Sequence, residues 1–264
     1  MPFADVNGAR MYYESAGSGD AVVFVHAAVA DSRMWAGQVG AFAQRYRVIC
    51  PDLRGFGQTS APPMPFTHHD DLKALLDALG VGTVAAIIGC SNGGRVSMNF
   101  TLANPDRVQK LVMVCSAPGG FAPENFVPAK LDMESYEAEQ AGDLEKAARI
   151  GAQLWLAGAE RPVDQVDQDK LELVYEMTMI ALKKGQAGVG DEQSMTPPAI
   201  DRLSEIRVPT LVIVGDYDEP MASLAAPVME KGIPDVRVVH LPTGHLPSLE
   251  IPDEFNRVVL GFVG

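Results

Sequence analysis

The chain has 264 residues, of which 47% are hydrophobic and 21% are charged, a balance typical of a folded globular protein. Its 21 Lys and Arg residues against 34 Asp and Glu residues give a formal charge of −13, which argues against nucleic acids and anionic membranes as partners. Its apolar runs have the length of strands, so none predicts a membrane span. The first residues show no basic region followed by an apolar run, so we expect a cytoplasmic protein if the mature chain begins at Met1.

Eight short runs of mainly apolar and β-branched residues predict strands. They are Phe3–Val6, Arg10–Glu14, Ala21–Val25, Arg47–Ile49, Val84–Ile88, Lys110–Val114, Thr210–Val214 and Val236–His240. The first two flank Asn7-Gly8, a strong signal for a hairpin turn. Most of the later runs are continuously apolar, which is typical of strands buried on both faces of a parallel sheet. We therefore predict an α/β fold with a mostly parallel sheet that begins with an antiparallel hairpin.

The stretch between the sixth and seventh runs carries helical patterns. Leu144–Leu156 and Leu171–Leu182 predict helices, and residues 119–200 contain no convincing strand pattern. A helical insertion between two strands of a sheet is most simply a cap over one end of that sheet. We therefore predict a core domain made of residues 1–118 and 201–264, with a small helical cap inserted at 119–200.

The segment Gly89-Cys90-Ser91-Asn92-Gly93 follows an apolar strand and precedes a helical pattern. Gly-x-Ser-x-Gly in that context indicates a nucleophile elbow, in which a serine stands on a sharp turn and glycines let strand and helix pass close by. The turn aims the N–H of Asn92 toward the nucleophile, so this amide is a candidate oxyanion donor. The alternative interpretation is a tight polar loop. Cys90 is a rival nucleophile, but the residue two positions before it is not a glycine.

A nucleophilic serine needs a base and an acid that orients the base. His245 lies in a loop directly after the last predicted strand, at the sheet edge that also presents Ser91, so we take it as the base. His240 lies within a strand pattern and is the second choice. The acid follows the seventh predicted strand, where the residues alone do not separate Asp216 from Asp218.

Four segments together resemble the α/β-hydrolase fold family, and the resemblance covers nearly the whole chain. They are the His-Ala loop with its downstream tryptophan (Phe24–Trp35), the Asp-x-Arg-Gly-x-Gly loop (Pro51–Ser60), the elbow (Gly89–Gly93), and the acid and histidine loops (Gly215–Asp218 and Gly244–Glu250). The pattern is most similar to the branch of 3-oxoadipate enol-lactonases and small carboxylesterases. The family's fold is a mostly parallel eight-stranded sheet flanked by helices.

The resemblance implies a Ser91–His245–Asp218 triad, because the acid is the last residue of the family's Gly-x-x-Asp pattern. It also implies that the amide of Ala28 joins that of Asn92 in the oxyanion hole. One departure affects this hole, since Ala27 stands where the family usually has glycine. No cofactor is implied. The chain shows neither a Cys-x-x-Cys pair nor a histidine cluster at metal spacing, so we expect no metal site.

These residues predict hydrolysis of a carboxylic ester or lactone through an acyl-enzyme, with a small molecule as the partner. The alternatives are a ligand-binding or signalling member with slow turnover, a C–C hydrolase, and a cofactor-free perhydrolase using the same triad. A substrate carboxylate would need a cation, and the choices are Arg33, Arg95, Arg149 and Arg161. Candidates for the substrate pocket, each of which also suits core packing, are Trp35, Phe121, Phe126, Trp155 and Met177.

Overall fold

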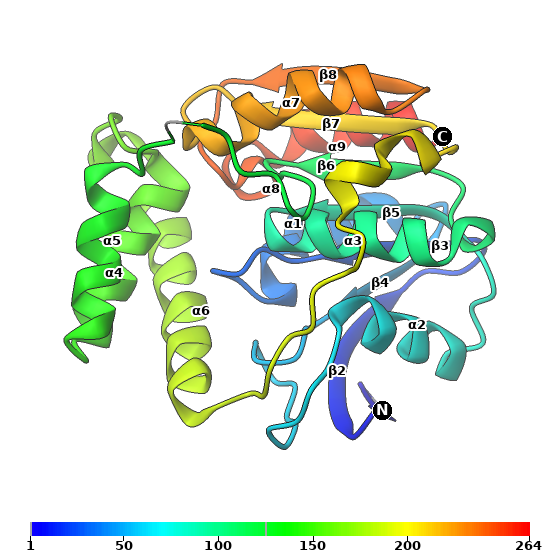
Figure 1. Ribbon diagram of the computed structural model, residues 1–264, viewed down its shortest axis with the longest axis horizontal. Coiled ribbons are helices and arrows are strands. Elements are labelled where there is room, and N and C mark those ends of the chain that lie inside the picture. Colours follow the sequence, from blue (N-terminus) through cyan, green and yellow to red (C-terminus); the bar gives the residue numbers. More distant parts are fainter. Residues whose placement is uncertain (1, 125) are drawn as a thin grey trace.

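The computed structural model describes residues 2–124 and 126–264. An eight-stranded sheet crosses the molecule with helices on both faces (Figure 1). Its strands are β1 (Phe3–Val6), β2 (Ala9–Ala16), β3 (Ala21–Val25), β4 (Arg47–Pro51), β5 (Val84–Cys90), β6 (Leu111–Val114), β7 (Thr210–Gly215) and β8 (Val236–Leu241). Their order is β1-β2-β4-β3-β5-β6-β7-β8. The pairs β1–β2 and β2–β4 are antiparallel and the other pairs are parallel, which confirms the predicted fold class.

The helices lie on the two faces of the sheet and in a group between β6 and β7, which we call the cap. They are α1 (Ala36–Phe42), α2 (His68–Ala78), α3 (Asn92–Ala103), α4 (Lys130–Gln140), α5 (Leu144–Ala157), α6 (Gln168–Ala187), α7 (Pro220–Gly232), α8 (Pro247–Glu250) and α9 (Pro252–Val263). Helices α2, α3 and α7 cover one face, and α1, α8 and α9 cover the other. No helix of the described residues is long and apolar enough to cross a membrane.

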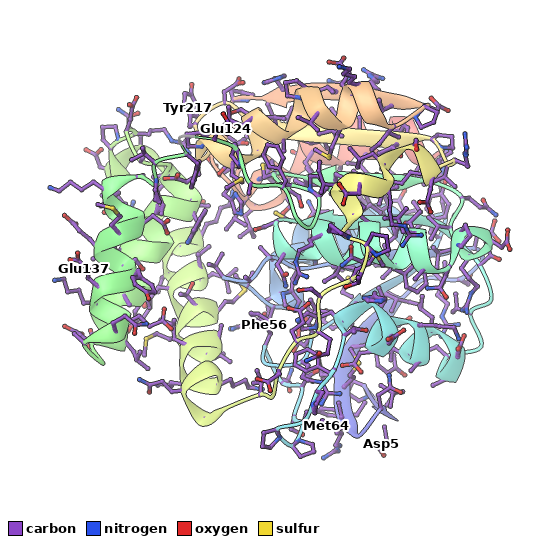
Figure 2. All side chains as sticks on the ribbon, in the orientation of Figure 1. Asp5, Phe56, Met64, Glu124, Glu137 and Tyr217 are labelled. Atoms are coloured by element: carbon purple, nitrogen blue, oxygen red, sulfur yellow. The ribbon has the colours of Figure 1, made fainter. Side chains whose placement is uncertain are left out.

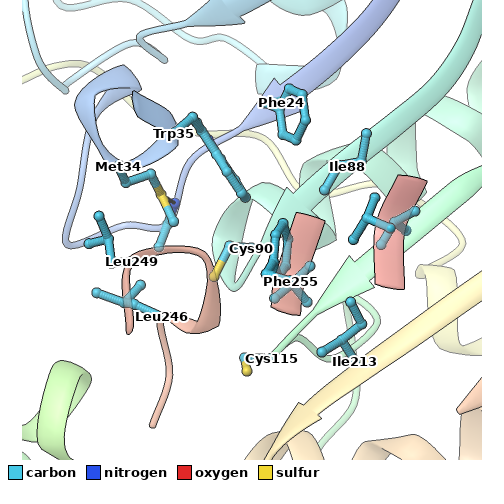
Figure 3. Close-up of a cluster of buried hydrophobic side chains, with 14 of the residues drawn as sticks. Phe24, Met34, Trp35, Ile88, Cys90, Cys115, Ile213, Leu246, Leu249 and Phe255 are labelled. Carbon is cyan, nitrogen blue, oxygen red and sulfur yellow. Dashed lines mark hydrogen bonds between the residues drawn. The ribbon is translucent and has the colours of Figure 1, made fainter. Parts of the chain in front are cut away.

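Strand β3 shows why the central strands read as continuous apolar runs. Val22 and Phe24 belong to the buried cluster against α1 and α9, while Val23 and Val25 belong to the cluster against α2 and α3. Successive side chains of a strand point to opposite faces, so a strand covered on both sides needs apolar residues at every position. Figure 3 shows the first cluster, in which Phe24, Ile88 and Phe255 pack between the sheet and α9.

Three helices, α4, α5 and α6, follow one another between β6 and β7 and stand beside the sheet (Figure 1). The sequence predicted α5 and α6 but not α4. Helix α4 is mostly polar and Ala138 is its one buried residue, so its sequence lacks the apolar stripe that reveals a helix. Glu137 of α4 points outward, away from the core (Figure 2).

The cap is fastened to the loop that follows β8. The carbonyl oxygen of Trp155, near the end of α5, accepts a hydrogen bond of 3.1 Å from the amide of His245. Arg161, just after α5, forms an ion pair of 2.5 Å with Glu250 of α8, and the other carboxylate oxygen of Glu250 accepts from the amide of Gly244. The side chains of this pair are 15% and 9% exposed, so the junction is largely shielded from water.

Candidate active site

Ser91 stands between the end of β5 and the start of α3, in a backbone conformation with φ 55° and ψ −119°. A residue with a side chain rarely adopts a positive φ, so this conformation is strained and must be held by its surroundings. The amide of Ser91 donates to the carbonyl of Val114 at 2.8 Å, and the carbonyl of Ser91 accepts from the hydroxyl of Ser116 at 2.7 Å. These bonds to the β6 end hold the turn in place.

The two glycines of the elbow are required by close backbone approach. A Cβ on Gly89 would collide with the carbonyl group of Gly93, and a Cβ on Gly93 would collide with the carbonyl oxygen of Val25 in β3. Backbone atoms cannot move aside as a flexible side chain does. The motif spacing is therefore a steric consequence of packing α3 directly over β5 and β3.

We expect Gly89→Ala to lower the free energy of unfolding by about 3 kcal/mol or more, because the added methyl group overpacks a rigid backbone junction. Urea denaturation followed by circular dichroism measures this change. Gly40→Ala is the matched control, since Gly40 is exposed in α1 and a Cβ there meets no atom within 4 Å. That variant should stay within about 1 kcal/mol of the parent. Similar losses in both variants would contradict the steric explanation.

His245 and Asp218 are joined by a hydrogen bond of 2.8 Å between Nδ1 and Oδ1. A carboxylate only accepts, so Nδ1 carries the proton and Nε2 keeps a free lone pair. The same Asp218 oxygen accepts from the amide of Glu219 at 2.7 Å. The indole ring of Trp155 lies 4.6 Å from the imidazole centroid. The side chains of His245 and Asp218 are only 9% and 2% exposed, so the pair is oriented and shielded from water.

The two aspartates that the residues alone did not separate have different partners. Asp216 lies 3.1 Å from Nδ1 of His240 on the edge strand β8, and both of these side chains are about half exposed. Asp218 instead lies beside His245 in the interior. A solvated pair is screened and weak, whereas the buried pair holds its geometry. The structure therefore separates the candidates and favours Asp218 and His245 as members of one site.

Ser91, Asp218 and His245 line a single cavity of about 390 Å³. It lies between the carboxyl ends of β5, β6 and β7 and the cap. Of the predicted pocket residues, Phe126 and Trp155 line it. The other residues around it are Asn92, Arg95, Cys115, Ser116, Ala117, Asp132, Glu219, Met221 and Ala222.

Trp35, Phe121 and Met177 do not line this cavity, which corrects the sequence-based expectation. Trp35 is fully buried and packs against the rings of Phe24 and Phe255 (Figure 3). Met177 is 1% exposed, and its sulfur accepts from the amide of Asp31. Phe121 packs against the buried cluster under α3 and α7. Each of these side chains fills space in the protein interior, the alternative that suits large apolar residues.

The loop after β3 carries the second predicted oxyanion donor. Ala28 is exposed and lines a neighbouring cavity of about 290 Å³ together with Asn92. His26 braces this loop from beneath, since its Nε2 accepts from the amide of Leu53 at 2.9 Å, and burial lowers its pKa. Ala27 is not among the residues with positive φ, so the loop accommodates alanine where the family usually has glycine. The oxyanion role of Ala28 and Asn92 stays a prediction.

His68, the first residue of α2, is buried, although a position at the start of a helix suggests a solvated side chain. Its side chain is 5% exposed and lies between the rings of Phe56 and Phe66. Burial lowers the pKa of His68 to about 3, so the imidazole is neutral at ordinary pH. The neutral imidazole packs against these two rings, and Glu192 lies 3.8 Å from its Nε2 atom. The sequence at the helix start does not show which neighbours cover it.

The buried cysteines behave as small apolar residues. Burial raises the pKa of the Cys90 thiol well above its ordinary value, so Cys90 is a poor nucleophile.

One group of potential metal ligands occurs in the described part of the chain. The ligand atoms of Cys115, Asp218 and His245 all lie within 4.8 Å of one another. Burial also raises the pKa of Cys115, and the other two side chains already bond each other. A protonated thiol is a poor metal ligand, so this arrangement suits a hydrogen-bonded pair better than a metal.

Each arginine proposed as a partner for a substrate carboxylate already has a carboxylate partner. Arg95 is the only one of the four that lines the cavity, and its guanidinium contacts both oxygens of Glu192 at 2.8 and 2.9 Å and also donates to Oδ1 of Asn92. The remaining pairs are Arg33 with Asp31 and Glu176, Arg149 with Glu145, and Arg161 with Glu250.

Asp132 and Glu219 are cavity residues that the sequence did not reveal. Asp132 is one of several acidic residues in the cap, and nothing in its spacing distinguishes it from the others. Glu219 directly follows Asp218 in an acidic turn, which is the one signal that could have drawn attention to it.

Residues 20–252 match the model of the family described as alpha/beta hydrolase fold, so the chain belongs to this family. A 2-hydroxy-6-oxononadienedioate/2-hydroxy-6-oxononatrienedioate hydrolase of Burkholderia vietnamiensis is 30% identical, covering 96% of this chain and 91% of that protein. Carboxylesterase YbfK of Bacillus subtilis is 29% identical, covering 92% of this chain and 79% of that protein. An enol-lactonase of Burkholderia xenovorans has the same fold, with a TM-score of 0.81, 22% identity and 99% of each chain covered.

Proposed function

We propose that this protein is a serine hydrolase that cleaves a carboxylic ester or lactone. The observation that carries the proposal is the arrangement in one cavity of a serine on a strained elbow and a buried histidine held by an aspartate. These are the nucleophile, base and orienting acid that acyl transfer requires. The esterase and enol-lactonase similar to this chain add support.

In the proposed reaction, Nε2 of His245 takes the hydroxyl proton of Ser91 as Oγ attacks the substrate carbonyl carbon. Asp218 accepts from Nδ1 and stabilises the imidazolium that forms. The amides of Asn92 and Ala28 stabilise the negatively charged oxygen, an effect of about 3–4 kcal/mol for each donor. His245 then gives its proton to the leaving alkoxide, which leaves an acyl-serine. Water, activated by His245, hydrolyses the acyl-serine and regenerates the enzyme.

Cleavage of C–C bonds is less well supported. The relative from Burkholderia vietnamiensis is named for substrates that are dioates and therefore dianions. In this chain the cavity is lined by Asp132, Glu219 and the triad aspartate, and its one arginine is already paired with Glu192. Such a cavity repels a dianion, so a neutral or positively charged ester fits better.

A screen of p-nitrophenyl esters, lactones and a fluorophosphonate probe tests the proposal, with Ser91→Ala as the blank. We expect labelling of Ser91 and turnover above roughly 1 s⁻¹ on at least one substrate. The blank should show neither. Labelling without turnover on any substrate, together with a ligand that raises the melting temperature, would instead indicate a binding or signalling member of the family.

A further inference from the structure

Two carboxyl side chains line the cavity beside the triad and have no role in the proposed chemistry. Asp132 lies in the first turn of α4 in the cap, and Glu219 precedes the first residue of α7 in the core. Glu219 is only 7% exposed, and its Oε1 atom is buried without a hydrogen-bond partner in the described structure. A buried polar atom without a partner is costly. The Glu219 carboxyl lines the cavity, so a cationic group of a substrate bound there would stabilise it.

In the described part of the chain, neither of these carboxyls has a lysine or arginine as its ion-pair partner, and the Arg95 guanidinium in the same cavity is paired with Glu192. Burial raises the pKa of Glu219, and the nearby charges of Asp132 and Asp218 raise it further, while the amide of Ala129 and His245 oppose the shift. Burial also raises the pKa of Asp132. A cation placed between them would relieve this repulsion.

The other side chains of the cavity suit the same kind of group. The aromatic residues Phe126 and Trp155 line the same cavity as Asp132 and Glu219. Aromatic faces attract cations, and rings combined with carboxylates form typical sites for ammonium groups. The single cavity arginine, Arg95, is neutralised by Glu192. The formal charge of −13 also favours the approach of a cation over that of an anion.

We propose that Asp132 and Glu219 form a recognition site for an ammonium group, so that the substrate is an ester or lactone that carries a positive charge. This inference rests on the proposed function, because it assigns the substrate class of the same site. The cap contributes one carboxyl and the core the other, so a bound ammonium group would also hold the cap against the core over the triad.

Matched substrates that differ only in the charge of one end test the inference. One set has an acyl chain ending in trimethylammonium, in its uncharged tert-butyl isostere, or in a carboxylate, each as a p-nitrophenyl ester. A second set places the same charge difference on the leaving group, as the thioester butyrylthiocholine and its tert-butyl isostere. We expect kcat/KM for the cation to exceed that of the isostere by about tenfold or more in one set, because the carboxylates and the aromatic rings of the cavity both attract a cation. The carboxylate should react most slowly.

Variants assign the preference to the two carboxyls. Glu219→Gln and Asp132→Asn should each reduce the ratio of kcat/KM between cation and isostere severalfold, and the double variant should bring it close to one. Glu137→Gln is the control on the same helix, since Glu137 is exposed and does not line the cavity. That variant should keep the parent ratio. Because Asp132 is partly exposed, Asp132→Asn keeps the test open if Glu219→Gln does not fold. A parent ratio of one or below, or a ratio that survives both substitutions, would overturn the inference.

Binding to Ser91→Ala separates this inference from the proposed function. Calorimetry with butyltrimethylammonium and with butyrate measures recognition without turnover, and we expect binding of the cation alone, abolished when Asp132→Asn and Glu219→Gln are added. Such binding, found together with a parent protein that hydrolyses no ester, supports the ammonium site and overturns the hydrolase proposal. Hydrolysis of neutral esters without any preference for the cation supports the hydrolase and overturns the ammonium site.

Discussion

Replacement of Ser91 by alanine is expected to reduce kcat/KM for ester hydrolysis by about 10⁵-fold or more while leaving the fold intact. The loss is large because base and acid have no function without the nucleophile, and only binding and the oxyanion donors remain. The bonds that hold residue 91 use its backbone N–H and carbonyl, so they persist in the variant. Steady-state kinetics on the best substrate of the screen, with the melting temperature recorded in parallel, measures both parts of this prediction.

Two controls make the Ser91 result specific. Ser97→Ala removes a serine hydroxyl from α3, the helix that follows Ser91. This hydroxyl donates to the carbonyl of Gly93 and lies outside the cavity. Cys90→Ala removes the neighbouring thiol, the rival nucleophile, which is fully buried. Both variants should keep activity within about tenfold of the parent. Activity that survives in Ser91→Ala but disappears in Cys90→Ala would show that the nucleophile has been assigned to the wrong residue.

The fold was predictable where burial and local sterics act on the same residues. Strands covered on both faces need apolar residues throughout, which made the central strands visible. The elbow was predictable because close backbone approach admits only glycine at Gly89 and Gly93. Helix α4 was missed because it packs at the edge of the cap and buries almost no side chain fully. A helix that buries few side chains does not need a periodic apolar pattern, so its sequence does not reveal it.

The site was only partly predictable, because function depends on contacts between distant segments. Trp35 and Trp155 look alike in sequence, yet one fills the core and the other lines the cavity. The acidic character of the cavity arises from Asp132 and Glu219, which lie far apart in the chain and line one cavity only because the cap packs against the core. No local sequence pattern indicates that two such distant residues line the same cavity. The same holds for Arg95, whose neutralisation depends on Glu192, 97 residues further along the chain.

Replacement of Asp218 by asparagine is expected to reduce kcat by about 10⁴-fold, whereas Asp216→Asn should leave kcat within about twofold of the parent. The two aspartates make the same kind of contact, each through Oδ1 to Nδ1 of a histidine, at 2.8 Å for Asp218 and 3.1 Å for Asp216. They differ in burial, since the Asp218 side chain is 2% exposed and that of Asp216 is 46% exposed. The pair is therefore an internal control for what a histidine–aspartate contact does inside and outside the cavity.

The expected loss in Asp218→Asn comes from the imidazole. An asparagine amide can donate to Nδ1, which favours the tautomer that carries its proton on Nε2 and cannot accept the proton of Ser91. The substitution also removes the negative charge that stabilises the imidazolium in the transition state. The Asp216 pair is solvated, so its loss changes surface hydration and little else. Measuring kcat, KM and the melting temperature for both variants decides the assignment. Equal losses of kcat, or a larger loss in Asp216→Asn, would show that the acid is not Asp218.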